Sequence, residues 1–349
     1  MVLESALLDV RDVNSATAPR EQETERAESG AQTGWGEPGV GHRSDWRRHR
    51  AEIEQGLKLH TPWGIRRGRR LSLLDGACNL ARKGLTVTGL LPAMSRRALQ
   101  IRRTEIELAF PHLPAAFEGY RILQISDPHF DAVDGVGDAI CASAAGVQVD
   151  LCVFTGDYRA ADGGAFRERS ILGPMARIVE QIAAPDGCLA VLGNHDTHEM
   201  VDPLEEIGAR VLANEQIEIR RAEQTIELLG LDDPYRFYSP SSSRFASSLP
   251  VAPDRFRILL VHTPDFAQQA ADLGVALYLC GHTHGGQICL PGGRPIVRHL
   301  HKETGLGRGL WRRGQMIGYT SRGAGVAGAL PIRLFAPAEI TLFRLRRAD

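Results

Sequence analysis

Short apolar runs alternate with amphipathic segments along the chain from Thr104 to its end. Runs rich in aliphatic and aromatic residues are typical of buried strands, and apolar residues three or four positions apart are typical of helices. This alternation predicts an α/β or α+β sheet protein. The expected strands are 120–126, 151–155, 188–192, 225–229, 256–261, 276–280, 316–320 and 339–345. The expected helices are 166–182, 203–212 and 264–273, and the serine-rich stretch 239–243 is expected to be a loop insertion.

The first hundred residues lack this alternation. Residues 1–45 are rich in Glu, Ala, Gly, Ser and Thr, which predicts a disordered tail. Residues 46–103 contain runs of arginine around Trp46 and Trp63, and we expect a basic, partly helical arm with one or two amphipathic helices in 71–91. Two interpretations of this arm remain open, namely peripheral contact with a membrane surface and a solvated basic linker. The remaining residues, 104–349, are expected to form the functional domain.

The composition of the 349 residues is that of an ordinary soluble protein, with 43% apolar and 24% charged residues. The net charge of −1 provides no overall field to attract nucleic acid, which disfavours nucleic acid as a partner. No run reaches the roughly 18 consecutive apolar residues of a membrane-spanning helix. The six cysteines form no CxxC pair, so we expect reduced thiols in a cytoplasmic protein, peripheral at the inner membrane if the arm binds lipid.

Polar side chains follow five of the expected strands, at the point where each strand ends. They are Asp127 and His129, Asp157, the run Asn194, His195 and Asp196, then His262, and the pair His282 and His284. A single Asp there is typical of a helix cap, but caps do not require histidine, and strand ends are where α/β proteins place ligand groups. So many Asp, Asn and His ligands, without cysteine, exceed the needs of one tetrahedral zinc. The set predicts two divalent ions (Mn, Fe or Zn) about 3.5–4 Å apart, an arrangement that hydrolyses phosphate esters.

The set DxH, GD, GNHD, H and GHTH resembles the calcineurin-like metallophosphoesterases over residues 101–346. The resemblance implies an α-β-β-α sandwich of four layers, in which two mixed sheets are flanked by helices and a dimetal site lies at the strand ends. By the same resemblance, Asp127, His129 and His284 would bind the first ion, Asn194, His262 and His282 would bind the second, and Asp157 would bridge them. His195 would stabilise or protonate the departing oxygen, and Asp196 would orient its ring.

Residues 113–127, 281–288 and 321–325 are similar to bacterial phosphodiesterases of the YaeI and YkuE type. This branch implies phosphodiester or lipid-linked phosphate substrates, among which is UDP-2,3-diacylglucosamine. Tyr158 and Gln287 are expected to line the cleft. Two interpretations of Arg322 remain open, since a guanidinium suits a phosphate oxygen but also pairs with a surface acid. Protein phosphatases carry Glu where this chain has Asp196, which argues against a phosphoprotein phosphatase.

The leading hypothesis is a phosphodiesterase or pyrophosphatase in which a hydroxide bridging the two ions attacks phosphorus. A nuclease or a cyclic-nucleotide phosphodiesterase is the alternative enzyme. A nuclease should have a basic face on its catalytic domain, whereas the concentrated positive charge of this chain lies before that domain. A third hypothesis, a non-catalytic and metal-free scaffold, conflicts with the complete set of ligands.

Overall fold

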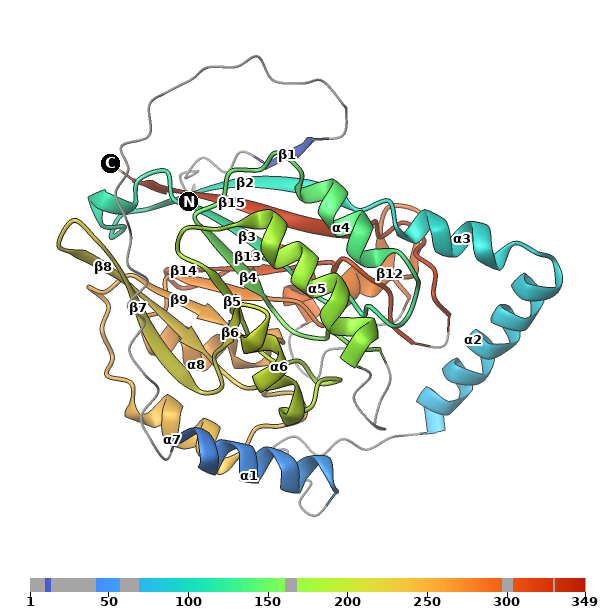
Figure 1. The fold of residues 1–349 in the computed structure, drawn as a ribbon, viewed down its shortest axis with the longest axis horizontal. Coiled ribbons are helices and arrows are strands. Elements are labelled where there is room, and N and C mark those ends of the chain that lie inside the picture. The colour runs from blue at the N-terminus through green and yellow to red at the C-terminus, as the bar shows by residue number, and fades with distance from the viewer. Residues whose placement is uncertain are drawn as a thin grey trace, which may run out of the picture.

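The computed structural model describes residues 10–13, 42–56, 69–160, 168–296, 304–328 and 330–348, and two mixed β-sheets dominate it (Figure 1). The first sheet contains, in spatial order, β1 (Val10–Val13), β2 (Arg102–Phe110), β15 (Glu339–Arg347), β3 (Arg121–Ile125), β4 (Leu151–Phe154), β5 (Cys188–Ala190) and β6 (Ala209–Val211). The second contains β13 (Gly309–Arg313), β14 (Met316–Thr320), β10 (Leu277–Cys280), β9 (Arg257–Leu260), β8 (Gln224–Gly230) and β7 (Glu215–Arg221). A short hairpin pairs β11 (Cys289–Leu290) with β12 (Arg294–Pro295).

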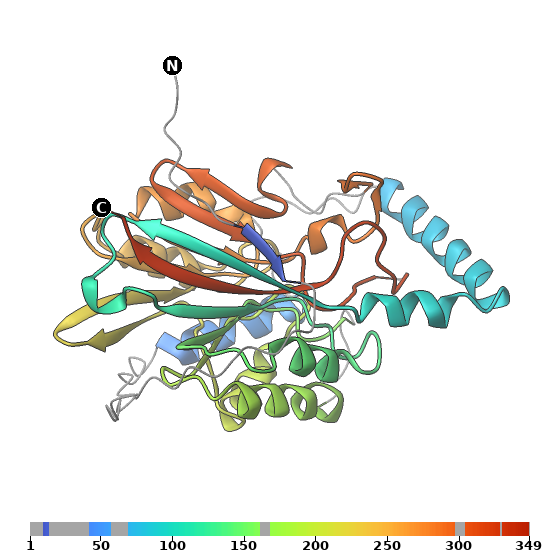
Figure 2. The same cartoon turned by 90° about the horizontal axis from the view of Figure 1, so that it is seen from above.

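Helices cover the outer face of each sheet (Figure 2). The helices are α1 (His42–Glu54), α2 (Arg69–Val87), α3 (Leu91–Ala98), α4 (Val136–Ala144), α5 (Glu168–Ile182), α6 (Val201–Glu206), α7 (Pro240–Ser248) and α8 (Ala267–Asp272). Ile140 of α4 and Met175 of α5 pack on the first sheet, whereas Phe245 of α7 and Ala270 of α8 pack on the second. The predicted four-layer α-β-β-α sandwich is therefore confirmed.

The period-two alternation of side chains explains why each strand contributes to two cores. In β3, Ile122 faces the core between the two sheets, while Leu123 and Ile125 face the helices outside. Strand β10 does the same, with Leu277 between the sheets and Tyr278 against the outer layer. Because these strands are buried on both faces, they appear in the sequence as continuous apolar runs.

Parallel pairing brings the ends of the central strands together. Strands β3, β4 and β5 run parallel in the first sheet, and β8, β9, β10 and β14 run parallel in the second. The two sheets are joined at this edge, where Gln124 Nε2 donates to the carbonyl of Cys280 at 3.0 Å. The loops that leave these strands therefore converge on one place between the sheets.

Two expected elements differ in the structure. The helix expected over 203–212 ends with α6 at Glu206, because Gly208 turns the chain with a φ of 91° and the following residues form the edge strand β6. The stretch 239–243, expected to be a loop, begins α7 instead. Ser239 caps this helix, since its hydroxyl accepts from the backbone N–H of Ser242.

The first hundred residues contain more ordered structure than expected. The tail prediction is wrong at Val10–Val13, which pairs with β2, and α1 begins within the same stretch. Trp46 is fully buried and donates its Nε1–H to Asp232 at 2.7 Å, so it is not available to a membrane. Trp63 lies outside the described residues. Among the residues that are described, no helix is both long and apolar enough to cross a bilayer.

Candidate metal centre

The loops that follow the strands hold their polar residues in a strained backbone conformation. Left-handed φ values are costly for residues with a side chain, about 1–3 kcal/mol each, and tend to occur at functional sites. Five non-glycine residues at these strand ends adopt them, namely Asp127 (50°), His129 (43°), Asp157 (59°), His282 (73°) and His284 (52°). The strain turns their side chains toward one another, which indicates that ligand geometry takes precedence over backbone preference here.

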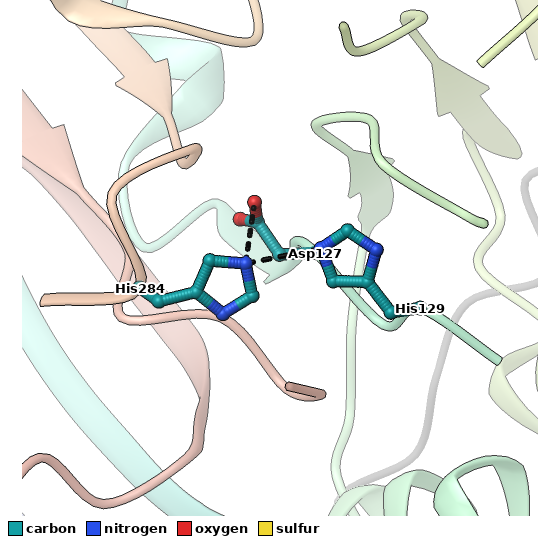
Figure 3. Close-up of side chains that lie close together, drawn as sticks. All are labelled: Asp127, His129 and His284. Atoms are coloured by element: carbon teal, nitrogen blue, oxygen red, sulfur yellow. Dashed lines mark hydrogen bonds and ion pairs between the residues drawn. The ribbon is translucent and has the colours of Figure 1, made fainter. Parts of the chain in front are cut away.

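Asp127, His129 and His284 form the first of two buried clusters (Figure 3). His284 Nε2 lies 3.5 Å from Asp127 Oδ1 and 3.0 Å from His129 Nε2. Two nitrogen ligands about 2.1 Å from one ion and at right angles to each other are separated by about 3 Å, so the spacing of the rings fits a single ion. His129 Nδ1 lies 2.7 Å from the carbonyl oxygen of Arg159, and donating to it would leave Nε2 free to bind metal.

Asp157, His262 and His282 form the second buried cluster. His262 Nε2 lies 3.1 Å from Asp157 Oδ2 and 3.2 Å from Asn194 Oδ1, so Asn194 belongs to the same group. His262 Nδ1 lies 2.7 Å from the carbonyl oxygen of Thr155, the same arrangement that orients His129. The second cluster therefore offers two imidazoles, a carboxylate and an amide oxygen.

Asp157 lies between the two clusters. Its Oδ2 is 3.1 Å from His262 Nε2 on one side and 3.8 Å from His129 Nε2 on the other. Its Oδ1 accepts from the backbone N–H of His195 at 2.9 Å, which fixes the carboxylate plane. Burial acts to raise the pKa of Asp157, but His262 and His195 hold it well below its usual range. An ionised carboxylate in this position fits a bridge between two cations.

Two glycines allow the loops to approach each other closely. A Cβ on Gly281 would lie 1.9 Å from Ser126 Oγ and 2.1 Å from Asp127 Oδ2. A Cβ on Gly193 would lie 2.2 Å from Asp157 Oδ1. Any side chain at these positions would displace a ligand carboxylate, which explains why the chain places glycine directly before its ligands.

The electrostatics of the first cluster favour a cation. Burial raises the pKa of Asp127, His262 opposes the rise and the nearby Asp157 adds to it, and together they bring this pKa to about 7. Burial also lowers the pKa of His129 to about 4, so this imidazole is neutral at pH 7 and has a lone pair to offer. Buried carboxylates close together are stabilised by a divalent ion, and the ligand set of oxygen and imidazole suits Mn, Fe or Zn.

The two predicted catalytic residues have different surroundings. The side chain of His195 is 20% exposed and its Nε2 lies 3.9 Å from Asp157 Oδ2, which puts it at the mouth of the centre. Asp196 does not have the predicted role of orienting that ring. Its two oxygens accept from the backbone N–H groups of Asp157, Tyr158 and Gly193, at 2.7, 2.9 and 2.7 Å. Asp196 instead holds two ligand loops together.

The three residues expected to bind substrate also differ in their surroundings. Tyr158 was wrongly expected to line the cleft, because it is fully buried in the core and its hydroxyl donates to the carbonyl of Val191. The amide of Gln287 bonds to the loop at Ala327 and Leu330, which gives it a structural role. Arg322 pairs with the buried Glu339 at 3.1 Å, and its side chain remains 32% exposed beside Gly285.

Sequence reasoning missed other residues beside the centre. The ring of Tyr235 lies 4.5 Å from that of His282, and Arg236 donates to the carbonyl of Asn194 at 3.3 Å. Both follow β8, but the rule applied to the other strand ends considered Asp, Asn and His and therefore passed over a tyrosine and an arginine. Arg333 is buried and lies 3.1 Å from His284 Nδ1, but 49 positions separate the two residues and no local pattern connects them.

Comparison with known proteins identifies this arrangement. Residues 120–286, which carry every predicted ligand, match the calcineurin-like phosphoesterases. The metallophosphoesterase YkuE of Bacillus subtilis is 32% identical over 71% of this chain and 87% of its own length. This chain belongs to the calcineurin-like phosphoesterase family.

Other members of the family carry more specific names. The phosphodiesterase YaeI of Escherichia coli is 30% identical over 65% of this chain and 82% of its own length. The UDP-2,3-diacylglucosamine pyrophosphatase LpxG of Chlamydia muridarum is 25% identical over 70% of this chain and 89% of its own length. The family and the names of its members make this chain a phosphoric ester hydrolase that binds divalent metal.

Proposed function

We propose that this calcineurin-like phosphoesterase hydrolyses a phosphodiester or pyrophosphate bond, with two divalent ions, in a lipid-linked substrate. The observation that carries the proposal is the pair of buried Asp/His clusters with Asp157 between them. Two ions held there would clamp the phosphoryl oxygens and supply an activated water for in-line displacement. Burial of the ligands excludes bulk water and strengthens these interactions.

The protein's own groups account for the other requirements of the reaction. His195 lies at the mouth, outside both ligand clusters, where it would donate a proton to the departing oxygen. Arg322 is held by Glu339 with part of its side chain exposed, so it would bind a phosphate oxygen without losing much side-chain freedom. Gly285 and Gly286 do not leave open space for a substrate, because a Cβ there would lie 2.9 Å from Arg322 Cγ and 2.3 Å from Pro295 Cβ; they let the loop of His284 pack closely against these side chains.

An apolar, basic surface beside the centre supports the lipid part of the proposal. Leu80, Val87 and Leu90, on and just after α2, are 73%, 88% and 53% exposed. Residues 76–100 contain Arg82, Lys83, Arg96 and Arg97, all exposed, and no Asp or Glu. Figure 2 shows α2 at the end of the molecule that also contains the β11–β12 hairpin. Apolar side chains flanked by cations fit the surface of an anionic bilayer, where we propose peripheral binding at the inner membrane.

The β11–β12 hairpin, at the same end of the molecule, reaches the metal centre. Leu290 in β11 and Ile296 just after β12 are exposed, and Phe335, on the loop that bonds to Cys289, is 60% exposed. A Cβ on Gly286 would lie 2.3 Å from the ring of Pro295, so the hairpin packs directly against the loop of His284. A lipid-linked phosphate held in a bilayer would thus enter the centre from this side.

Hydrolysis assays with added Mn test the proposed function. We expect the purified protein to cleave bis-p-nitrophenyl phosphate and UDP-2,3-diacylglucosamine, since the second joins a lipid to a pyrophosphate. Cleavage of the artificial diester alone would support the assignment as a phosphodiesterase but would contradict the proposal of a lipid-linked substrate. A protein that binds two metal ions but cleaves neither compound would overturn the proposed function.

The membrane surface is tested with a double variant, Leu80→Asp with Val87→Asp. The wild-type protein should co-sediment with vesicles of phosphatidylcholine that contain phosphatidylglycerol, and the variant should not, because two carboxylates replace apolar contacts. Val251→Asp is the matched control, since Val251 is 69% exposed but lies before β9, outside this surface. Both proteins should still cleave bis-p-nitrophenyl phosphate. Equal sedimentation of the double variant and the control would contradict membrane binding here.

A further inference from the structure

Arg50 of α1 contacts the metal-binding loop from outside the matched residues 120–286. Its side chain is fully buried, and Nη2 donates to the carbonyl of Gly193 at 3.0 Å and to that of Asp196 at 2.7 Å. These two carbonyls lie on either side of Asn194 and His195. A single guanidinium nitrogen therefore ties together both ends of the loop that carries an expected metal ligand and the expected proton donor.

The rest of the guanidinium is held just as firmly. Nη1 donates to the buried Asp232, which also accepts from Trp46 Nε1 at 2.7 Å. Nε donates to Glu54 at 2.8 Å, and the guanidinium carbon lies 3.3 Å from the centre of the Phe237 ring. A planar fork whose three nitrogens all donate hydrogen bonds and which lies against an aromatic ring has little freedom, so it can fix the backbone that it contacts.

The carboxylate of Glu54 extends this support along the loop. Its Oε1, which accepts from Arg50, also accepts from the backbone N–H of His198 at 2.9 Å, and its Oε2 lies 2.6 Å from the ring Nδ1 of His198. On the opposite side, the carboxylate of Asp196 binds the backbone of Gly193 and Asp157. The loop from Gly193 to His198 is thus clamped between its own Asp196 and residues of α1.

We infer that Arg50 is a positioning residue for the second metal ion and for His195, and that α1 is a working part of the catalytic centre. This inference rests on the two-metal function proposed above. Asn194 Oδ1 lies 3.2 Å from His262 Nε2 only while the loop keeps its shape. Groups that orient ligands without touching the metal can change its affinity by roughly 10- to 100-fold.

Arg50→Lys is the variant that tests this. Lysine keeps the charge that Asp232 requires but lacks the planar fork, so it cannot bond both carbonyls and both acids. We expect the affinity for the second Mn to fall roughly 10-fold or more, while the first Mn binds as in the wild-type protein. Titration of the metal-free protein followed by EPR should show a mononuclear Mn signal where the wild-type protein shows a coupled pair.

Arg257→Lys provides the matched control. Arg257 is also buried, pairs with Glu227 at 2.7 Å, and donates to the carbonyls of Pro250 and Leu273 at 2.6 and 2.9 Å. It begins β9, and His262 follows the other end of that strand, about 16 Å away. We expect this variant to lose thermal stability to a similar extent but to keep the coupled Mn pair.

The affinity for the second Mn and the EPR signal together distinguish a positioning role of Arg50 from a purely structural one. A coupled pair in Arg50→Lys with unchanged affinity would show that Arg50 only stabilises the fold, and would overturn the inference. If Arg50→Lys does not fold, Asp232→Asn decides, because it keeps the side-chain shape but removes the negative charge that holds Nη1. This variant should also lower the affinity for the second Mn, and unchanged affinity would again overturn the inference. A wild-type protein without two ions would instead contradict the proposed function.

Discussion

Asp157→Ala is expected to lower kcat for bis-p-nitrophenyl phosphate by about three orders of magnitude or more. The carboxylate lies within 4 Å of a histidine of each cluster, so its removal takes a ligand from both ions. Two ions together supply several kcal/mol of transition-state stabilisation, and each 1.36 kcal/mol is a factor of ten in rate. Bound metal should fall from two equivalents to one or fewer. Steady-state kinetics and elemental analysis of the same preparation measure both effects.

Asp186→Ala is the control for this variant. Asp186 is also buried and accepts from the hydroxyl of Tyr120 at 2.7 Å, but it precedes β5, whereas the ligand loop follows that strand. Its loss should reduce stability by about 1–3 kcal/mol through an unsatisfied hydroxyl, without changing metal content. Turnover that survives in pure Asp157→Ala protein would rule out the dimetal assignment.

His195→Gln is expected to give the second largest effect, with a size that depends on the leaving group. Protonation of a departing oxygen contributes about 10²–10⁴-fold. We expect a loss in this range for an alkyl ester or a pyrophosphate, whose leaving oxygen requires a proton. The loss should be much smaller for p-nitrophenolate, which is stable as an anion. Comparing kcat for the two kinds of substrate measures the difference.

Metal content is the control for the His195 variant. His195 belongs to neither ligand cluster, and the bond to Asp157 comes from its backbone N–H, which glutamine retains. Two equivalents of metal should therefore remain bound. An equal loss for both leaving groups would mean that His195 does not donate the proton, and a loss of metal would mean that it is a ligand.

The strand ends could be predicted from sequence because the signal is local. Asp127, Asp157 and His282 each follow a buried apolar run within a few residues, and parallel strands bring such ends to one edge of a sheet. The alternation of apolar runs with helical segments predicted an α/β or α+β sheet protein, whereas the four layers followed from the family resemblance. The structure adds the strained φ values, which no residue pattern in the sequence revealed.

The supporting contacts could not be predicted, because they join distant residues. Arg50 and Gly193 are 143 positions apart, and the arginine run around Trp46 is equally typical of an exposed arm. Asp196 adjoins His195 in sequence, but its oxygens face the backbone of other loops. Tyr158 follows a ligand directly, yet the turn at Asp157 directs its ring into the core. The sequence of neighbouring residues did not determine which way these side chains point.

Strands β2 and β7 were missed for a different reason. Their buried residues alternate with charged ones, as in Glu215–Arg221, so neither forms a continuous apolar run. Alternation with period two is itself a strand signal when one face of the sheet is less covered. Weighing that pattern equally with apolar runs would have extended the domain to Arg102, and would have added β2 to the first sheet and β7 to the second.

The central claim is that two metal ions lie on either side of Asp157. Anomalous diffraction from crystals loaded with Mn tests it most directly, because it locates each ion without reference to activity. We predict two peaks, one among Asp127, His129 and His284 and the other among Asn194, His262 and His282, with Asp157 between them. A single peak, or peaks away from these side chains at saturating Mn, would contradict the two-metal account.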